Sequence, residues 1–531
     1  MVKQIYYNAA QQYVMALAPN KSVIIAGRGF GKSEGVDSYY TARNAIEMPH
    51  SSGGIVSPSY RKLLLNTLPP VVLGWERMGF KKNKHFIVGG RAPENKGFKL
   101  PHICPEKDAW HFTIHWFNGS IHRMISLERQ LSANSMSLDY AAVFEARYIN
   151  KKRFSEEVIP AIRGNRRYYK RCPWHEGYHI SSDQPLTKDG TWLWDFEKQN
   201  DPELNDLILD EYRLFYNAIQ EKKLRAAVEH RRNLLIFRKQ CVLYTEYDSL
   251  ENIDVLGFDY IKNMENSLSP SVFLASVMSK KIMKFDVNMF YSSFDSSVHT
   301  YVSENLDYVK GLKLDQQIYD SCRFDGDLNW NSPLIISLDY NTDINSLVVG
   351  QIDGSNLKTI KTMYVKKPRK LKELVQDFCN YYSPRINREV IYYYDNTAIG
   401  TNAVSDETFK DMVVKVLKAN QYRVNAVYIG QLPWHRVRLQ QIDNALKGDP
   451  NYLFPLFNKM NAENLLIAFE RTAYLMGKKG IEKDKRIERQ PDSAEYPAEH
   501  RPHITEAFDS LFHGANFFKV VGRGRQGPSR M

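Results

Sequence analysis

The sequence has few cysteines and no long apolar segment, and both absences limit what the protein can be. Its five cysteines are far apart and none forms a C-x-x-C pair, so a disulfide framework or a structural zinc site is not expected. Cys172 and His175 form a C-x-x-H pair, but no second pair lies near them in the sequence. No apolar run reaches the roughly 18 residues that a membrane span requires. The polar N-terminus also lacks a signal-peptide core, so the sequence predicts a cytoplasmic protein with no membrane partner.

Positive charge is in excess. The 531 residues include 72 lysines and arginines against 60 acidic residues, which gives a net charge of +12. Such an excess favours a polyanionic partner such as nucleic acid, although a merely basic surface has the same composition. The chain is also too long for a single hydrophobic core, so two or three domains are expected.

Strand and helix patterns divide the chain into four segments. Short apolar runs such as SVIIAG and YAAVFEA alternate with helical stretches in residues 1–190, which predicts an α/β domain with a parallel sheet and flanking helices. Residues 191–325 are charged and helical and predict a helical lid or linker subdomain. A second α/β pattern covers residues 326–518. Residues 519–531 form a basic tail that we expect to be disordered.

The segment IIAGRGFGKSEG, residues 24–35, has the features of a phosphate-binding loop. It fits the pattern G-x-x-x-x-G-K-[ST], with Ala26 at the first glycine position. Lys32 would reach the β- and γ-phosphates of ATP, and Ser33 would offer its hydroxyl to Mg²⁺. An apolar strand precedes the loop and a helical stretch follows it, which is the context that such a motif needs. Three glycines would let backbone N–H groups point at phosphate, namely Gly27, Gly29 and Gly31.

A carboxylate that orients the attacking water is expected at the end of another strand. In SLDYAAVFEAR, an apolar strand ends at Phe144 and Glu145 follows it. Glu145 would then lie at the carboxyl edge of the sheet, beside the phosphates, although a surface glutamate at a strand end has the same pattern. Phe144 stands where an aspartate usually helps to hold Mg²⁺. Asp139 cannot replace it easily, because it begins the strand and five strand residues span about 17 Å.

Two apolar strands in the C-terminal segment each end in an aspartate. LIISLDY ends at Asp339 and EVIYYYDN at Asp395; aspartate is depleted in strands, although either one alone is more typical of a turn. Asp509 lies at the edge of an apolar stripe in the helical segment HITEAFDSLFHGANFF. Three such carboxylates suit a two-metal nuclease that binds Mg²⁺ or Mn²⁺. Asp343 and Glu506 are weaker candidates, since a turn and a solvent-exposed position explain them.

A basic run lies between the first two of these aspartates. Five of the seven residues from Lys366 to Lys372 are basic. Next to a nuclease site, such a run favours sequence-independent contact with the DNA backbone, whereas elsewhere it is typical of a solvated face. The long polar loop over residues 477–502 is compatible with a flap over DNA or a contact with a partner.

In this order, the motifs resemble those of the large terminase subunits of tailed bacteriophages, which are DNA-packaging motors. AAQQYVM is similar to the adenine-contacting glutamine motif of that family, and AGRGFGKS to its deviant phosphate loop, in which an arginine precedes the lysine. MISLERQLSANSMSLDYAAVFEA is similar to the approach to the catalytic glutamate, and YHISSDQPLTKDGTWLW to the coupling motif. His503, ahead of Asp509, matches the late helix. Ala26 and Phe144 depart from the family pattern.

The resemblance implies a role for each of these residues. It implies that Gln11 or Gln12 contacts adenine and that Arg28 and Lys32 neutralise charge on the γ-phosphate, with Arg28 acting in cis or in trans. Two serines of the coupling motif, Ser181 and Ser182, would sense the γ-phosphate. An RNase H-like nuclease domain would hold its metal ions on three aspartates, Asp339, Asp395 and Asp509.

The resemblance also implies a biological setting. A large terminase hydrolyses ATP to translocate double-stranded DNA into a procapsid and cuts concatemeric DNA. The implied partners are the portal protein, a small terminase subunit and further copies of the chain in a homo-oligomeric ring on the portal. The implied location is the cytoplasm of the infected bacterial host and, transiently, the procapsid. Two alternatives remain open: a DNA-dependent ATPase or helicase-like motor with an inactive second domain, and a structural portal-docking protein with a degenerate nucleotide site.

Overall fold

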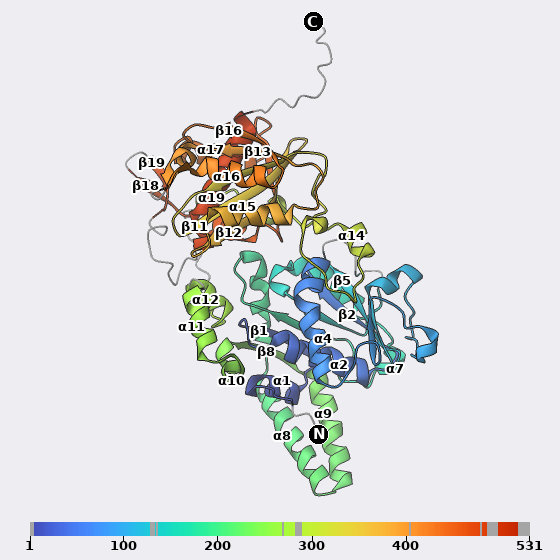
Figure 1. Cartoon of the computed structure of the whole chain (residues 1–531). Helices are drawn as coiled ribbons and strands as arrows, with labels where there is room; N and C mark the ends of the chain where they lie inside the picture. Colours follow the sequence, from blue (N-terminus) through green and yellow to red (C-terminus); the bar gives the residue numbers. More distant parts are fainter. Residues whose placement is uncertain are drawn as a thin grey trace. The chain divides into compact units, whose positions relative to one another are not determined.

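The chain forms two compact units, each built on a mixed α/β sheet (Figure 1). The structure is a computed structural model that describes residues 5–127, 133, 136–267, 270–281, 289–402, 405–477, 480–485 and 498–518. Within these residues, unit 1 contains positions 5–281 and 304–320, and unit 2 contains positions 289–303 and 321–518. No helix in the described part of the chain is long and apolar enough to cross a membrane. The basic tail, residues 519–531, lies outside the described residues.

An eight-stranded sheet forms the centre of unit 1. Its order is β3-β4-β5-β2-β6-β7-β1-β8. The six neighbouring strands β5-β2-β6-β7-β1-β8 pair in parallel, and β3 and β4 add an antiparallel edge. The carboxyl ends of β1, β6 and β7 therefore meet at one edge of the sheet. The strands are β1 (Lys21–Ala26), β2 (Ser52–Ser57), β3 (Phe86–Val88), β4 (Thr113–Trp116), β5 (Ile121–Ser126), β6 (Tyr140–Phe144), β7 (Gly177–Ser182) and β8 (Val242–Tyr247).

Helices cover both faces of this sheet, so its central strands are apolar on both sides. Val23 and Ile25 of β1 pack with Val143 in one core, while Ile24 packs with Val14 in another. This two-sided burial explains the continuous apolar runs that mark the strands in the sequence. The longer helices are α1 (Ala9–Leu17), α2 (Ser38–Glu47), α4 (Leu68–Arg77), α8 (Pro202–Gln220), α9 (Leu224–Gln240), α11 (Phe258–Ser267) and α12 (Pro270–Ser276).

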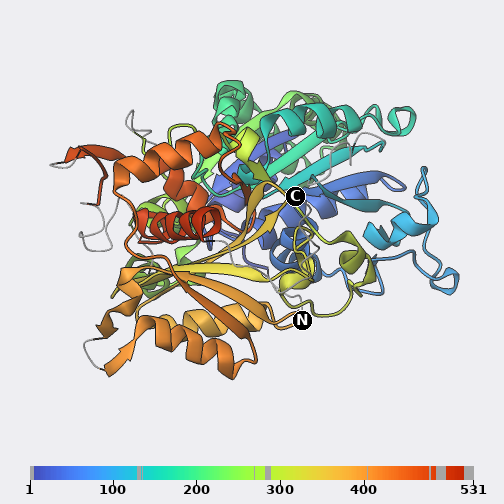
Figure 2. The ribbon, with the colours of Figure 1, turned by 90° about the horizontal axis from the view of Figure 1, so that it is seen from above.

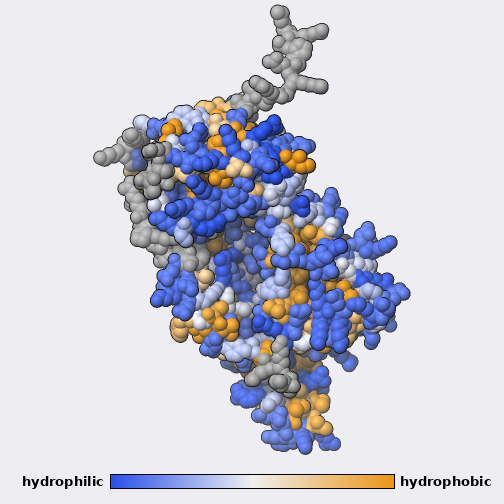
Figure 3. Space-filling view, viewed as in Figure 1, coloured by the Kyte–Doolittle hydropathy of each residue, from blue (hydrophilic) through white to orange (hydrophobic). Residues whose placement is uncertain are grey.

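The segment predicted as a helical subdomain, residues 191–325, is divided differently in the structure. Its helices α8 and α9 lie side by side as a hairpin (Figure 1). The next element, β8, pairs with β1 in the sheet of unit 1. Residues 289–303 belong to unit 2 instead. The α8–α9 hairpin carries apolar side chains on its surface (Figure 3), among them Leu214, Tyr216, Leu224 and Val228.

Unit 2 is built on a seven-stranded sheet with the order β16-β13-β10-β11-β12-β17-β9. An antiparallel meander, β10-β11-β12, is extended by β13 and β16, which run parallel to β10. This is the arrangement of an RNase H-like domain, as the sequence predicts. The strands are β9 (Thr300–Tyr301), β10 (Leu334–Asp339), β11 (Ile344–Asp353), β12 (Asn356–Lys366), β13 (Glu389–Tyr394), β16 (Arg423–Tyr428) and β17 (Phe454–Asn458).

The two faces of this sheet carry different helices (Figure 2). Leu334, Ile336 and Leu338 of β10 pack with α15 (Leu371–Tyr381) and α16 (Phe409–Ala419). Ile335, from the opposite face of the strand, packs in the core that contains α19 (Pro502–Phe517). Because side chains alternate along a strand, Asp339 lies on the α19 face. The same core receives α17 (His435–Leu446) and α18 (Glu463–Arg471).

A fully buried histidine in unit 1 is held in its neutral form. Nδ1 of His122, on β5, accepts a hydrogen bond from the indole N–H of Trp116 at 3.0 Å. An indole only donates, so the proton of the neutral ring is on Nε2, which lies 2.9 Å from the hydroxyl of Tyr140. Burial lowers the pKa of His122 to about 3.

This histidine should make unit 1 sensitive to acid. Below about pH 6.5 the unfolded chain binds a proton at His122 that the folded chain does not bind, so stability falls with pH by about 1.4 kcal/mol per pH unit from this group alone. The contribution is complete above pH 6.5 and is lost progressively down to about pH 3. His122→Gln keeps a donor and an acceptor but does not titrate. Urea unfolding followed by tryptophan fluorescence between pH 7 and 5 should show a shallower slope for the variant, and equal slopes would contradict the assignment.

Candidate functional site

The predicted phosphate loop follows β1, as the sequence indicates. Gly29 and Gly31 have φ angles of 89° and 86°, in the left-handed region that strains other residues. At Gly27 a Cβ atom would lie 2.2 Å from the carbonyl oxygen of Val277. The loop then enters a helical turn, Lys32–Asp37, that continues into α2. Each of the three glycines is therefore required by the local geometry, two by their dihedral angles and one by close packing.

Lys32 lies at the centre of a cluster of charges at the loop. Its ammonium group donates to the carbonyl oxygen of Ala26 and, at 2.6 Å, to a carboxylate oxygen of Asp183. The other oxygen of Asp183 lies 3.6 Å from Nε of Arg28 and 3.8 Å from a guanidinium nitrogen of Arg147. Burial opposes ionisation of Asp183, but the three cations, Lys32 foremost, outweigh it and hold the pKa well below its usual range. Asp183 is therefore a carboxylate that neutralises the loop.

Glu145 comes directly after β6 at the same edge of the sheet. Its φ angle is 54°, a conformation that costs a residue with a side chain about 1–3 kcal/mol. The carboxylate is partly buried, and none of the described residues donates a hydrogen bond or an ion pair to it. Two residues later, the N–H of Arg147 donates to the hydroxyl of Ser182 on β7 at 3.0 Å. Strain and a carboxylate without a partner are together typical of a catalytic position.

The two serines predicted to sense the γ-phosphate make hydrogen bonds within the protein in this structure. Ser182 accepts from the backbone of Arg147, and Ser181 donates to Asp37 at 3.1 Å. The other oxygen of Asp37 lies 2.8 Å from Nε2 of His179. Phe144, at the usual aspartate position, is fully buried. No carboxylate thus projects from the end of β6 itself.

Of the two glutamines predicted to contact adenine, Gln11 is placed at the loop and Gln12 is not. The amide of Gln11 donates to the carbonyl oxygens of Phe30 and Gly31, both at 3.2 Å. Its oxygen accepts from the backbone N–H of Asn8 in a capping box at the start of α1. Gln12 is exposed and its amide donates only to the backbone of its own helix start. A cavity of about 310 Å³ adjoins Gln11, and its lining includes Tyr6, Tyr7, Gly31, Gly35, Arg77 and Asn252.

Replacing Gln11 should weaken nucleotide binding. Gln11→Ala removes the two hydrogen bonds to the loop, each worth about 0.5–1.5 kcal/mol, so we expect the Kd of ADP to rise by roughly 5- to 100-fold. Gln12→Ala makes the same chemical change one residue away and should leave the Kd unchanged. Titration calorimetry of both full-length variants would measure this, and equal effects at the two positions would show that Gln11 has no special role.

A segment from later in unit 1 covers the phosphate loop. Ser249 donates to the carbonyl oxygen of Arg28 at 2.6 Å, and Asn252 to that of Gly29 at 2.8 Å. The N–H of Arg28 donates to the carbonyl oxygen of Ser276, in α12. The loop backbone is thus bonded to residues 249–276, so a change in the loop on nucleotide binding would be transmitted to this segment.

In unit 2, two predicted aspartates come together at the ends of adjacent strands. Asp339 ends β10 and Asp395 follows β13, and these strands pair in parallel. Burial raises the pKa of Asp395, and the negative charges of Asp339 and Glu506 raise it further. His503 of α19 lies 3.1 Å from Asp339 through Nδ1. Asp339, Asp395 and the start of α19 therefore share one site.

The third predicted aspartate, Asp509, is bound by a tyrosine and two cations in this structure, and its role as a metal ligand stays a prediction. One of its oxygens accepts from the hydroxyl of Tyr291 at 2.7 Å, and the other accepts from Arg438 at 2.9 Å and Lys483 at 2.7 Å. The α19 carboxylate whose charge reaches Asp395 is Glu506, which the sequence suggested was exposed. Residues 506 and 509 lie one turn apart on a helix that is buried nearly all round, so the apolar stripe does not distinguish them.

The described part of the chain contains no group of three or more histidine, cysteine or acidic side chains that is positioned to hold a metal ion. Lys483 lies 3.1 Å from Glu506 and 2.7 Å from Asp509. Its ammonium supplies, at these carboxylates, the positive charge that a metal ion would supply. The oxygen donors of Asp339, Asp395 and Glu506 are of the type that suits Mg²⁺ or Mn²⁺.

No protein-family model and no curated protein matches the chain. The large terminase of a thermophilic bacteriophage matches over 97% of this chain and 100% of its own, at 10% identity and a TM-score of 0.36. The Thermus phage P74-26 large terminase ATPase domain matches over 52% and 94%, at 14% identity and 0.31. The large terminase nuclease of thermophilic phage G20c matches over 44% and 100%, at 10% identity and 0.25.

The chain is structurally similar to phage large terminases over almost its whole length. Among the matching structures are the first of these terminases in complex with ADP and the G20c nuclease with bound magnesium. At identities and TM-scores this low, the likeness does not assign any residue. The roles of individual side chains therefore depend on the geometry of this chain.

The two α19 carboxylates should respond differently to mutation. Glu506→Gln should reduce Mn²⁺ affinity by roughly tenfold or more, because it removes an anionic ligand near Asp395. Asp509→Asn should mainly lower thermal stability, since it removes one of the two carboxylates that pair with Lys483 and Arg438 and leaves Glu506 as their remaining counter-charge. Mn²⁺ titration and thermal melting of both variants test this. Loss of Mn²⁺ affinity in Asp509→Asn at unchanged stability would restore Asp509 as the ligand.

The basic run in unit 2 is largely neutralised by acidic side chains. Lys367 pairs with Asp343 at 2.7 Å, Arg369 with Asp377 at 2.7 Å, and Lys372 with Glu407 at 3.7 Å. Lys366 pairs with Glu499. The run therefore offers less uncompensated charge to a DNA backbone than the sequence suggests. Asp343 belongs to this surface pairing and is mostly exposed.

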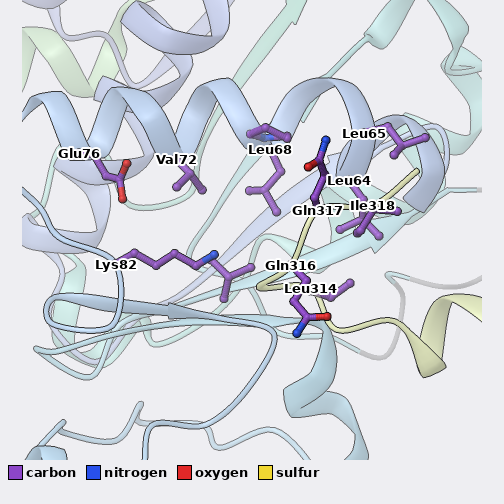
Figure 4. A pocket seen from close by; sticks show the side chains of 12 residues that line it. Leu64, Leu65, Leu68, Val72, Glu76, Lys82, Leu314, Gln316, Gln317 and Ile318 are labelled. Carbon is purple, nitrogen blue, oxygen red and sulfur yellow. The ribbon is translucent and has the colours of Figure 1, made fainter. Parts of the chain in front are cut away.

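A larger cavity in unit 1, of about 540 Å³, lies beside α4 (Figure 4). Leu64, Leu68 and Val72 line one wall, and Leu314 and Ile318 line the other. Six of the ten labelled side chains are apolar, Gln316 and Gln317 lie beside Leu314 and Ile318 in the sequence, and Glu76 and Lys82 lie toward one end (Figure 4). An apolar lining does not suit phosphate or a metal ion, so this cavity is not a candidate for the nucleotide.

Proposed function

We propose that this chain is a DNA-packaging enzyme of the large-terminase type. Unit 1 would hydrolyse ATP to translocate double-stranded DNA into a procapsid, and unit 2 would cut concatemeric DNA as a metal-dependent endonuclease. The observation that carries the proposal is the presence, in one chain, of two carboxylate sites at the carboxyl edges of parallel strands. Lys32 and Glu145 mark the first site, and Asp339 and Asp395 mark the second.

In the ATPase site, each residue has a task that follows from its position. Gln11 fixes the loop beside the cavity that would receive the adenine base. Lys32, which pairs with Asp183 in this structure, would move to the phosphates when ATP binds. Ser33 would hold Mg²⁺, which supplies charge neutralisation when bound. Glu145 orients the water that attacks the γ-phosphate, and Arg28 neutralises the charge that develops there.

In the nuclease site, Asp339 and Asp395, together with Glu506, would hold Mg²⁺ or Mn²⁺. Bound metal ions stabilise the attacking and leaving oxygens of a phosphodiester. His503, beside Asp339, orients that carboxylate. The ammonium group of Lys483 has to move away from Glu506 when a metal ion binds, because the ammonium and the metal ion would compete for the same carboxylate.

The proposal extends to the partners of a packaging motor. The order of the sequence motifs supports a portal protein, a small terminase subunit and a ring of further copies of the chain as partners. It likewise supports a location in the cytoplasm of an infected bacterial host and, during packaging, on the procapsid.

Two assays on one preparation of the full chain test the proposal. We expect ATP hydrolysis that DNA stimulates, and cleavage of plasmid DNA that requires Mn²⁺ or Mg²⁺. Absence of both activities would overturn the proposal and favour a structural docking protein. ATP hydrolysis without cleavage in any divalent metal would favour the alternative, a DNA-dependent motor with an inactive second domain.

A further inference from the structure

The ATPase site lacks a carboxylate where one is usually found. The residue before Glu145 is Phe144, which is fully buried. Asp139, the nearest aspartate earlier in the strand segment, accepts hydrogen bonds from the N–H of Ser52 and the amide of Asn165. Ser52 begins its strand, so Asp139 lies at the amino edge of the sheet, opposite the phosphate loop. Neither residue can contribute to a metal site beside Ser33.

Strand register places another carboxylate close to the position of Phe144, where an aspartate is usually found. Phe144 pairs with Ser181 on β7, and Ser182 pairs with Ile25 on β1. Paired residues of parallel strands project to the same face, and residues two apart along a strand share a face. The side chains of Phe144, Ser181 and Asp183 therefore project to one face.

That face carries the helix that begins with the phosphate loop. Ser181 bonds to Asp37, which lies in the same helical turn as Ser33. Asp183 is thus on the side of the sheet where Ser33 lies. It is also one strand nearer to the loop than the position that Phe144 occupies, since β7 lies between β6 and β1.

The charges around Asp183 suit an exchange of cations. Only 8% of its side chain is exposed, and Lys32 is its nearest cation, at 2.6 Å. When Lys32 turns to the phosphates of ATP, Asp183 loses its nearest cation and keeps the more distant Arg28 and Arg147, at 3.6 and 3.8 Å. Loss of the closest counter-charge is costly for a carboxylate this deeply buried. Mg²⁺ is usually held by one or two carboxylates together with phosphates and water, so the ion that accompanies ATP is a suitable replacement.

We propose that Asp183 is the carboxylate of the Mg²⁺ site in unit 1, in place of the aspartate that Phe144 replaces, and that it exchanges Lys32 for the Mg²⁺ of the nucleotide. This inference rests on the proposed ATPase function of unit 1. It explains how the ATPase site keeps a carboxylate for Mg²⁺ although a phenylalanine, Phe144, precedes Glu145. It also gives Asp183 two partners, Lys32 without nucleotide and Mg²⁺ with it.

The test compares nucleotide affinity with and without Mg²⁺ in the full-length protein. ATP-γ-S would be titrated calorimetrically into wild type, Asp183→Asn and Asp183→Ser, in Mg²⁺ and in EDTA. We expect Mg²⁺ to tighten binding to the wild type, and this enhancement to fall by roughly tenfold or more in both variants. Affinity in EDTA should stay the same or rise, because Lys32 no longer has a competing partner. Asp195→Asn, at an exposed ion pair with Lys151, is the matched control and should behave as wild type.

The outcomes separate this inference from the proposed function. Full Mg²⁺ enhancement in a folded Asp183 variant would overturn the inference and leave Asp183 as a counter-ion of Lys32, Arg28 and Arg147. Absence of ATP-γ-S binding by the wild type in both conditions would instead overturn the ATPase function. Thermal melting identifies a variant that fails to fold, and the serine variant, with a smaller side chain, then replaces the asparagine variant in the comparison.

Discussion

Glu145→Gln is expected to bind ATP with near-normal affinity and to hydrolyse it roughly 100- to 10,000-fold more slowly, the range of effect of a general base. The carboxylate has no partner among the described side chains, so its loss breaks no ion pair. It lies at the strand edge where the loop and Asp183 also lie. Steady-state hydrolysis and ADP binding, measured on the same full-length protein, separate the two effects.

The backbone at this position provides a second, independent readout. Glu145 has a φ angle of 54°, so Glu145→Gly should raise stability by about 1 kcal/mol through relief of strain, while hydrolysis is lost. Glu176 is a matched control, because it is also a glutamate with positive φ, at 60°. Glu176→Gly should gain stability without losing hydrolysis. Normal turnover in Glu145→Gln would remove Glu145 from the mechanism.

Asp395→Ala is expected to reduce Mn²⁺-dependent plasmid cleavage by roughly 100-fold or more while ATP hydrolysis continues. A metal ligand is lost, and even residues that only support a ligand cost about 10- to 100-fold. Burial and the charges of Asp339 and Glu506 raise the pKa of Asp395. Its removal relieves this repulsion in the metal-free protein, so thermal stability should not fall.

The same raised pKa predicts how metal binding depends on pH. A proton and a metal ion compete for Asp395, so Mn²⁺ affinity should increase as pH rises through the raised pKa, which lies above the usual value for an aspartate. Asp353→Ala, at the exposed end of β11, is a control for aspartate loss elsewhere on the sheet. Equal cleavage by wild type and Asp395→Ala would place the nuclease site elsewhere or remove the activity from the proposal.

Local sequence patterns predicted the strands that precede the candidate site residues. The apolar runs before Lys32, Glu145, Asp339 and Asp395 are continuous because their strands are covered on both faces. Such runs are properties of neighbouring residues and need no knowledge of the fold. The placement of these residues at the carboxyl edges of two α/β sheets follows from them.

Features that depend on distant contacts were not predictable in the same way. Asp183 is defined by Lys32, Arg28 and Arg147, which come from separate segments of the sequence. Its sequence signal was only an acidic residue after two serines at a strand end. Gln11 differs from its neighbour through hydrogen bonds to the loop that only the folded helix start creates.

Helix α19 shows a different limit. Its apolar stripe gave the face that packs on the sheet, but both Glu506 and Asp509 lie inside the unit. Lys483 and Arg438 pair with both carboxylates, whereas the hydroxyl of Tyr291 donates to Asp509, and none of these distant residues can be read from the helix sequence. A distant contact also determines to which unit residues 289–303 belong, because β9 joins its sheet by pairing with β17, roughly 150 residues later in the chain.

The path of the chain between the units determines how the protein can be divided. Residues 289–303 supply β9 and Tyr291 to unit 2, and residues 304–320 then return to unit 1, where Glu304 accepts from the N–H of Tyr60. A single proteolytic cut at any of these passages leaves a piece of one unit attached to the other. A fragment of unit 2 that begins at residue 326 would lack the tyrosine that binds Asp509. Recombinant fragments of this protein therefore need to be made by joining discontinuous segments rather than by truncation.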